Sequence, residues 1–223
     1  MKNYVLHGFI ALGLAACAEP SEAPTSLETE GAALDPERWF ERIDGLESGP
    51  RDSRMLQVFE IFHEHRDPDT ADLGLQFMQE YPGHERYEEV LLMTCDSLFY
   101  RREVERAIEL LEQARDSSGQ ASDNLQMSLA QAYAQAFQTD RAVQVYEKLG
   151  SSSKDQRTQA LARFMATYSK LYGGKEREAM RELELMSLEF RSCEDPDLVP
   201  FALAAETQLD IARGWNLPNG RQP

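Results

Sequence analysis

Apolar residues recur every three or four positions along most of the chain from Asp35 onward, and no stretch alternates strictly between apolar and polar residues. This period is that of an amphipathic α-helix, so the pattern predicts an all-α fold. The first predicted helix spans 35–50, because an aspartate followed by proline is a typical helix start and Gly49-Pro50 a typical end. Its apolar side is formed by Trp39, Phe40, Ile43 and Leu46.

A similar segment returns four times in the helical region. It begins at Ala71, Ala107, Ala142 and Ala179, which are 36, 35 and 37 residues apart. A second amphipathic stretch precedes each of these segments, so the pattern predicts four helix pairs. The apolar stripes predicted for the four preceding helices are Met55, Val58, Phe59 and Phe62; Leu91, Thr94, Cys95 and Leu98; Leu129, Ala130 and Tyr133; and Leu161, Phe164, Met165, Tyr168 and Leu171.

Short segments rich in polar residues and glycine separate these stretches. They predict turns inside the pairs at 67–69, 101–102, 138–140 and 173–174, and turns between the pairs at 81–83, 117–119 and 150–153. A last helix over 200–213, with Gly214 as its stop, is expected to cap the end of the stack. Its apolar side would consist of Phe201, Ala205, Leu209 and Ala212.

The four pairs resemble the tetratricopeptide repeat (TPR), a helix pair of about 34 residues. The resemblance covers 51–191 and is carried best by Leu129-Ala130, Tyr133 and Tyr146. It departs from the family pattern because no tryptophan opens a repeat and because Phe59 stands where a small residue is usual. The family implies an α-solenoid of about four TPR-like helix pairs with N- and C-terminal capping helices. The alternative is a helical bundle without repeats.

In TPR proteins, other proteins usually bind to a concave face lined by the first helix of each pair. Helical spacing places Glu89, Leu92, Asp96 and Phe99 on a stripe of the second pair that internal packing does not require. Met127 occupies the equivalent stripe of the third pair. We expect these five residues to bind a partner segment that is basic and apolar by turns, although Leu92 and Phe99 would serve equally well beneath a neighbouring helix.

The N-terminus predicts export and a lipid anchor. Residues 1–16 begin with Lys2 and continue as a short apolar run, which is typical of a signal peptide. Leu14-Ala15-Ala16-Cys17 resembles the lipobox of bacterial lipoproteins, a family in which the cysteine receives palmitate-type chains and becomes the first residue. An ordinary secretory signal is the alternative, since Ala16-x-Ala18 also fits a small-residue cleavage site, and it would discard Cys17.

The segment 17–34 is predicted to tether the body to the membrane. It carries two prolines and four glutamates but no lysine or arginine, so it cannot bury enough apolar surface to fold. A tether of this length typically spans about 25 Å. In enteric-type lipoproteins an aspartate after the lipid cysteine favours the inner membrane, so Ala18 points by resemblance to the outer membrane, with the body in the periplasm.

The charge argues against nucleic-acid binding, because the chain has a formal net charge of -16 and would repel phosphate backbones. No metal site is expected, since the histidines of His63-Glu64-His65 point to different sides of a helix. No phosphate-binding loop or catalytic motif is found, and no cofactor is expected. A bridge between Cys95 and Cys193 is compatible with an exported protein, as are two free thiols.

These features together predict an adaptor rather than an enzyme. The expected function is that of a lipid-anchored, TPR-type scaffold that binds other proteins during envelope or outer-membrane assembly. The alternatives are an adaptor for cell-wall glycan or cell-wall enzymes and a helical hydrolase without a recognisable motif. The predicted divisions are 1–16 (signal peptide), 17–34 (tether), 35–50 (N-terminal capping helix), 51–191 (repeats) and 192–223 (C-terminal capping helix and tail).

Overall fold

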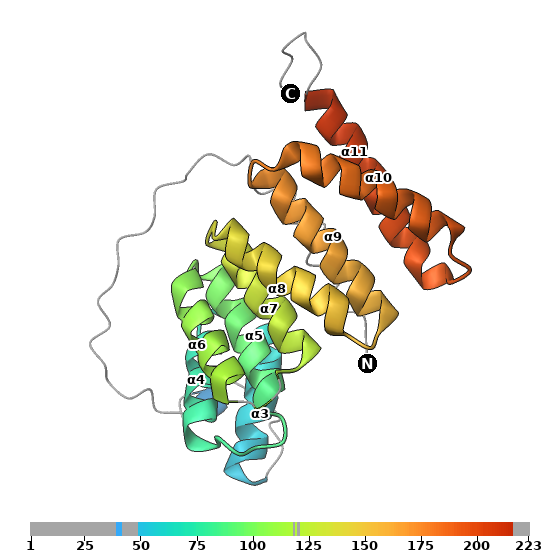
Figure 1. Ribbon diagram of the computed structural model, residues 1–223. Coiled ribbons are helices and arrows are strands. Elements are labelled where there is room, and N and C mark those ends of the chain that lie inside the picture. Colours follow the sequence, from blue (N-terminus) through green and yellow to red (C-terminus); the bar gives the residue numbers. More distant parts are fainter. Residues whose placement is uncertain (1–38, 42–48, 118, 120, 216–223) are drawn as a thin grey trace. The chain divides into compact units, whose positions relative to one another are not determined.

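The computed structural model describes residues 39–41, 49–117, 119 and 121–215 (Figure 1). The chain divides into two units, 1–34 and 35–223, and every described residue belongs to the second unit. The predicted signal peptide, Cys17 and the tether therefore lie outside the described residues, as do Ile43 and Leu46.

The described residues form helices and no strands, so the all-α prediction is confirmed. Trp39 and Phe40 are helical and buried. The helices that follow pack in sequence-adjacent pairs. They are α3 (Arg51–Glu64), α4 (Thr70–Glu80), α5 (Tyr87–Tyr100), α6 (Val104–Ser117), α7 (Asp123–Gln135), α8 (Thr139–Ser152), α9 (Gln156–Tyr172), α10 (Glu176–Ser192), the short 3-10 helix η1 (Pro196–Leu198) and α11 (Val199–Trp215).

Two predicted boundaries are wrong. Helix α8 extends into the predicted turn at 150–153 and ends at Ser152. Gly150 is helical and lies close to α9, since a Cβ built on it would be 3.0 Å from Arg163 Cγ. Helix α11 runs through Gly214 to Trp215. Glycine lowers helix stability by about 1 kcal/mol, which is too little to end a helix that is packed along its side.

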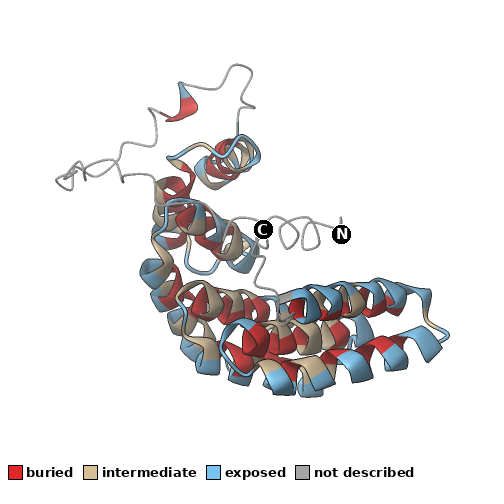
Figure 2. Cartoon of the chain, turned by 90° about the horizontal axis from the view of Figure 1, so that it is seen from above, coloured by how far each residue is buried: buried red, intermediate tan, exposed pale blue. Residues whose placement is uncertain are grey.

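Each helix packs mainly against its neighbours in the chain, and α7 also contacts α5 and α9, the first helices of the adjoining pairs. Figure 2 shows the buried residues running along one side of most helices. The predicted stripes of α3, α5 and α7 are entirely buried, as are Ala71, Ala107, Ala142 and Ala179. Helix α11 packs on α10 and contacts α9, with its four predicted apolar residues buried.

The turns inside the four pairs repeat the same backbone geometry. Each contains one residue with positive φ, namely Arg66, Arg102, Phe137 and Gly174. Each of these residues stands five positions before the corresponding alanine of the repeat. The four positive-φ residues are therefore also 36, 35 and 37 residues apart. The next residue donates its amide hydrogen to a carbonyl five residues back, at 2.8 to 2.9 Å, as in a Schellman cap. The carbonyl acceptors are Phe62, Leu98, Tyr133 and Lys170, which therefore hold equivalent places in the four pairs.

This geometry predicts that Phe137→Gly will be more stable than Phe137→Ala by about 1 kcal/mol, because a Cβ is disfavoured at positive φ. Phe137 has φ 57° and its side chain is 92% exposed, so neither variant removes much packing. Urea midpoints followed by circular dichroism measure the difference. Gly174→Ala is the matched reverse change and should cost a similar amount, since Gly174 has φ 85°. Equal midpoints for the two Phe137 variants would contradict the prediction.

In the first pair, the large Phe59 on α3 faces the small Gly74 on α4. A Cβ built on Gly74 would lie 2.8 Å from Phe59 Cε2 and 2.0 Å from Thr94 Oγ1. In the second pair the equivalent residues are Cys95 and Leu110, so the small and large residues are exchanged between the two helices. The first pair thus carries the large residue on its first helix and the small one on its second, the reverse of the second pair.

Candidate functional site

The predicted stripe on α5 faces solvent for most of its length. Glu89 and Asp96 are exposed, whereas Leu92 and Phe99 are half-buried and pack against the hydrophobic core. The structure therefore places these four residues on one side of a single helix. Part of each apolar side chain therefore supports the core, and part is open to solvent.

Met127 does not belong to this surface. Its side chain is only 8% exposed and lies in the same core as Leu129 and Tyr133. The helix α7 that carries it contacts α5, α6, α8 and α9, and this dense packing covers a position that equal helical spacing alone would leave open. We therefore leave Met127 out of the candidate surface.

Glu89 is held by an arginine of its own protein. Arg86 donates from Nε to Glu89 at 2.7 Å and from Nη2 to Glu60 at 2.6 Å, which ties the start of α5 to α3. The hydrogen bond from Arg86 lowers the pKa of Glu89. The charge of Glu89 is thus already compensated, and this residue is better suited to hold two helices together than to attract a partner.

Asp96 differs because it forms no hydrogen bond or ion pair with another described residue. Burial nevertheless raises its pKa to about 6, although the residue is solvent-exposed. Both observations fit a recessed carboxyl group, which is open to water on one side and loses hydration to the surrounding protein on the others. Asp96 is therefore a carboxylate whose lost hydration no described cation replaces.

The raised pKa predicts a specific pH dependence for Asp96→Asn. An unfolded aspartate has a pKa of about 3.9. Between about pH 4 and pH 6, the carboxyl group of Asp96 therefore keeps its proton in the folded chain but has lost it in the unfolded chain. As the pH rises through this range, the free energy of unfolding of the wild type should decrease, and that of the asparagine variant should decrease less. We expect the variant to be more stable by about 1 kcal/mol at pH 7, a value reduced for solvent exposure, and equal to the wild type at pH 3.5. Urea titrations at both pH values test this, and a pH-independent difference would contradict it.

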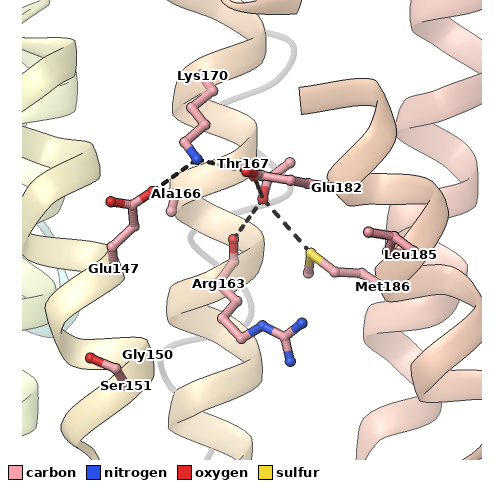
Figure 3. Close-up of a pocket in the computed structure, with 10 residues that line it drawn as sticks. All are labelled: Glu147, Gly150, Ser151, Arg163, Ala166, Thr167, Lys170, Glu182, Leu185 and Met186. Atoms are coloured by element: carbon pink, nitrogen blue, oxygen red, sulfur yellow. Dashed lines mark hydrogen bonds and ion pairs between the residues drawn. The ribbon is translucent and has the colours of Figure 1, made fainter. Parts of the chain in front are cut away.

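A second candidate site lies between α8 and α10, with α9 as its floor (Figure 3). It is an open groove with a volume of about 330 Å³. Lys170, Thr167 and Arg163 project from α9 into it, Glu147 lines it from α8, and Glu182 from α10. The groove thus combines charged groups on its floor with apolar residues of α10.

Lys170 is the centre of this groove. Only 5% of the residue is exposed, and its Nζ lies 2.8 Å from Glu147, 2.9 Å from Glu178 and 2.7 Å from Glu182. Desolvation lowers the pKa of Lys170, but the bonds to three carboxylates outweigh it and the net shift is upward. The carboxylates are themselves partly exposed, so the amine is covered by these side chains rather than by depth in the protein.

The equivalent place is apolar or aromatic in the other pairs, where Phe62, Leu98 and Tyr133 are buried. The preceding junction contains a related arrangement: Tyr133 hydrogen-bonds to Glu112, and the Arg141 guanidinium lies 4.1 Å from the Tyr133 ring centre. Lys170 takes the place of the tyrosine, and a glutamate, Glu178, takes that of Arg141. The fourth pair therefore has a lysine amine where the third pair has a tyrosine hydroxyl beside the Arg141–Glu112 ion pair.

The apolar stripe predicted for α9, the first helix of the fourth pair, is wrong in part. Of the predicted stripe only Leu171 is buried, whereas Phe164, Met165 and Tyr168 are half-buried. The fully buried side of α9 consists instead of small and polar residues. These are Ala160, Ala162, Ala166, Thr167, Ser169 and Lys170.

The described residues include no group of three or more His, Cys, Asp and Glu side chains placed to hold a metal ion. Cys95 and Cys193 are both free thiols, and burial raises the pKa of Cys95 to about 12, so it is not a thiolate at neutral pH. Within the described part of the chain, no helix is long and apolar enough to cross a membrane.

Comparisons with known proteins found no match, whether to protein-family models, to curated proteins or to solved structures.

Proposed function

We propose that the chain is an exported, lipid-anchored adaptor of the TPR class that binds other proteins through the first helices of its pairs. The repeat assignment is supported by the recurrence of one turn geometry at intervals of 36, 35 and 37 residues, close to the length of a TPR. The signature residues Leu129, Tyr133 and Tyr146 are all buried between helices, as such a repeat requires.

The observation that carries the binding function is the position of Asp96, which pairs with no described residue, between two half-buried apolar residues, Leu92 and Phe99. A lysine or arginine brought to Asp96 by a partner would restore the interaction that the carboxylate lost with water. Leu92 and Phe99 would contribute apolar contact on either side. A segment that is basic and apolar by turns therefore fits this stripe, and the negative charge of the chain would raise its association rate.

A photo-crosslinking amino acid at Phe99 tests this assignment in intact cells. We expect discrete crosslinked products, identified by mass spectrometry, which disappear when Asp96→Lys is added. The matched control carries the crosslinker at Leu203, an exposed residue of α11 that is 55% accessible. Identical products from both positions, or products that survive Asp96→Lys, would argue against binding at this stripe.

The membrane anchor rests on Cys17 alone. Cys17→Ser should prevent incorporation of a clickable fatty acid and release the protein from the membrane fraction, because stable anchoring needs about two acyl chains. Cys193→Ser is the control for thiol loss and should leave labelling intact. Labelling that persists in Cys17→Ser would show that the lipobox assignment is wrong.

A further inference from the structure

The groove between α8 and α10 shows a local inversion of the repeat pattern. On its floor, charged or polar residues replace apolar ones: Lys170 stands where the other pairs have Phe62, Leu98 and Tyr133. On its outer side the change is opposite. Leu188 stands where the other pairs have Glu80, Asp116 and Ser151, and Leu185 where the second and third pairs have Gln113 and Lys148.

This inversion leaves apolar surface exposed to water on the outer side of the groove. Leu185 and Leu188 are 65% and 67% exposed, so their apolar surface remains in water. Since the two leucines are three residues apart on α10, they lie on the same side of the helix, and Leu185 borders the groove. A charged floor beside an apolar rim is an arrangement that a ligand of matching chemistry would stabilise.

The groove is open because several of its residues are small. Gly150 holds the place of Gln79 and Arg115, and Ala166 holds that of Val58, Thr94 and Leu129. At the preceding junction the Tyr133 ring and the Arg141 guanidinium lie against each other. In the fourth pair the slender Lys170 side chain replaces the ring, and the space of about 330 Å³ remains.

The charges around the groove favour a cation. Lys170 faces Glu147, Glu178 and Glu182, and Arg163 is paired at its edge with both carboxylate oxygens of Glu189, at 2.9 and 2.8 Å. With Lys175, which acts on Glu178 and pairs with Asp140, three positive groups face five negative ones. Glu147 and Glu178 are each more than half exposed and can accept a further hydrogen bond from solvent-facing donors.

We propose that this groove is a second binding site, which receives a lysine or arginine side chain of another protein, flanked by apolar residues that cover Leu185 and Leu188. The cation lies near Glu147, and its aliphatic stem packs on Ala166 and the rim. The groove lies on α9, the first helix of the fourth pair, whereas the Asp96 stripe lies on α5, the first helix of the second pair. The two sites also use different sides of these helices. The groove is therefore independent of the proposed function, and the two sites would let one chain hold two partners at once.

The test uses the full chain labelled with ¹⁵N and the peptide acetyl-Leu-Lys-Leu-amide as a probe. We expect saturable shifts of amide signals from Gly150, Ser151 and Thr167, with a dissociation constant in the millimolar range typical of so small a ligand. Acetyl-Leu-norleucine-Leu-amide keeps the four-carbon aliphatic stem of lysine and lacks its ammonium group. It should bind at least about fivefold more weakly, and added salt should weaken the lysine peptide as well.

A double variant, Leu185→Gln with Leu188→Gln, tests the rim. Both side chains are exposed, so the fold should be retained, and binding of the lysine peptide should weaken by at least about fivefold. Leu203→Gln, on α11, is the matched control and should not change binding. The proposal would be overturned by the absence of saturable shifts at about 10 mM peptide, by shifts confined to α5, or by equal binding of the norleucine peptide.

Discussion

Gly74→Ala should destabilise the protein by about 3 kcal/mol, one of the largest effects expected from adding a single methyl group. The new Cβ would lie 2.0 Å from Thr94 Oγ1 and 2.8 Å from Phe59 Cε2, both far inside normal contact distance. Thr94 and Phe59 are buried, and Thr94 Oγ1 donates to the Val90 carbonyl at 2.6 Å, so neither side chain can withdraw without loss. Helices α4 and α5 would have to separate.

A second substitution identifies the contact responsible. Thr94→Ala alone should cost about 1 kcal/mol, because it removes one hydrogen bond and two buried atoms. Combined with Gly74→Ala it should recover part of the loss, since the closest clashing atom is gone, and the two changes should be non-additive by at least about 1 kcal/mol. Urea unfolding of the four proteins measures this coupling.

Gly214→Ala is the control for the helical preference of alanine. No atom lies within 4 Å of the Cβ that would be added there, so this change should be neutral or stabilising. If Gly74→Ala unfolded at the same urea concentration as Gly214→Ala, the tight packing of α4 against α5 would be refuted.

The sequence predicted the helix pairs well because packing in this chain is local. Each helix buries one side against its neighbours in the chain, so the period of apolar residues reports directly on structure. The alanines at 71, 107, 142 and 179 could be recognised because close helix contacts require small residues at regular intervals. The turns were harder to recognise, since three of the four positive-φ positions are not glycine.

The prediction of surface residues was less successful, because spacing along one helix contains no information about what covers it. Asp96 and Met127 looked equivalent as members of solvent-facing stripes, yet Asp96 is exposed and Met127 is in the core. The ion pair between Glu89 and Arg86 was missed, although the residues are only three positions apart. Its second half, the bond to Glu60, depends on the contact between two helix pairs.

The groove around Lys170 could not be recognised from apolar periodicity. Large residues such as Phe164 and Tyr168 dominated the predicted stripe of α9, whereas the buried side uses alanine, threonine and lysine. A signal was present in the alignment of the repeats, since Lys170 falls where Leu98 and Tyr133 stand in the preceding pairs. The hydrogen bonds of the four turns define which residues of the pairs are equivalent, and the sequence does not contain these bonds.

Lys170→Leu should destabilise the protein by about 3 kcal/mol. The leucine fits a place that holds Leu98 in the second pair, but the change leaves Glu147, Glu178 and Glu182 facing one another without their common cation. Lys175→Leu is the matched control, because Lys175 is 45% exposed and forms its ion pair with the exposed Asp140. It should cost far less than Lys170→Leu, because water and salt screen an exposed ion pair. Equal costs for the two variants would contradict a central role for Lys170.

Adding Glu182→Leu to Lys170→Leu should restore most of the lost stability, because it removes the least exposed of the three carboxylates. The double variant also has leucine at both places where the second pair has Leu98 and Leu110, which belong to or pack against its core. Glu147 and Glu178 are more than half exposed and can turn into water. The Thr167 hydroxyl, which loses Glu182 as an acceptor, can still donate to the Arg163 carbonyl at 3.0 Å. If the double variant is as stable as the wild type but no longer binds the lysine peptide, the charges of the groove serve binding and not folding. A double variant as unstable as Lys170→Leu alone would mean that this junction depends on its charges for stability.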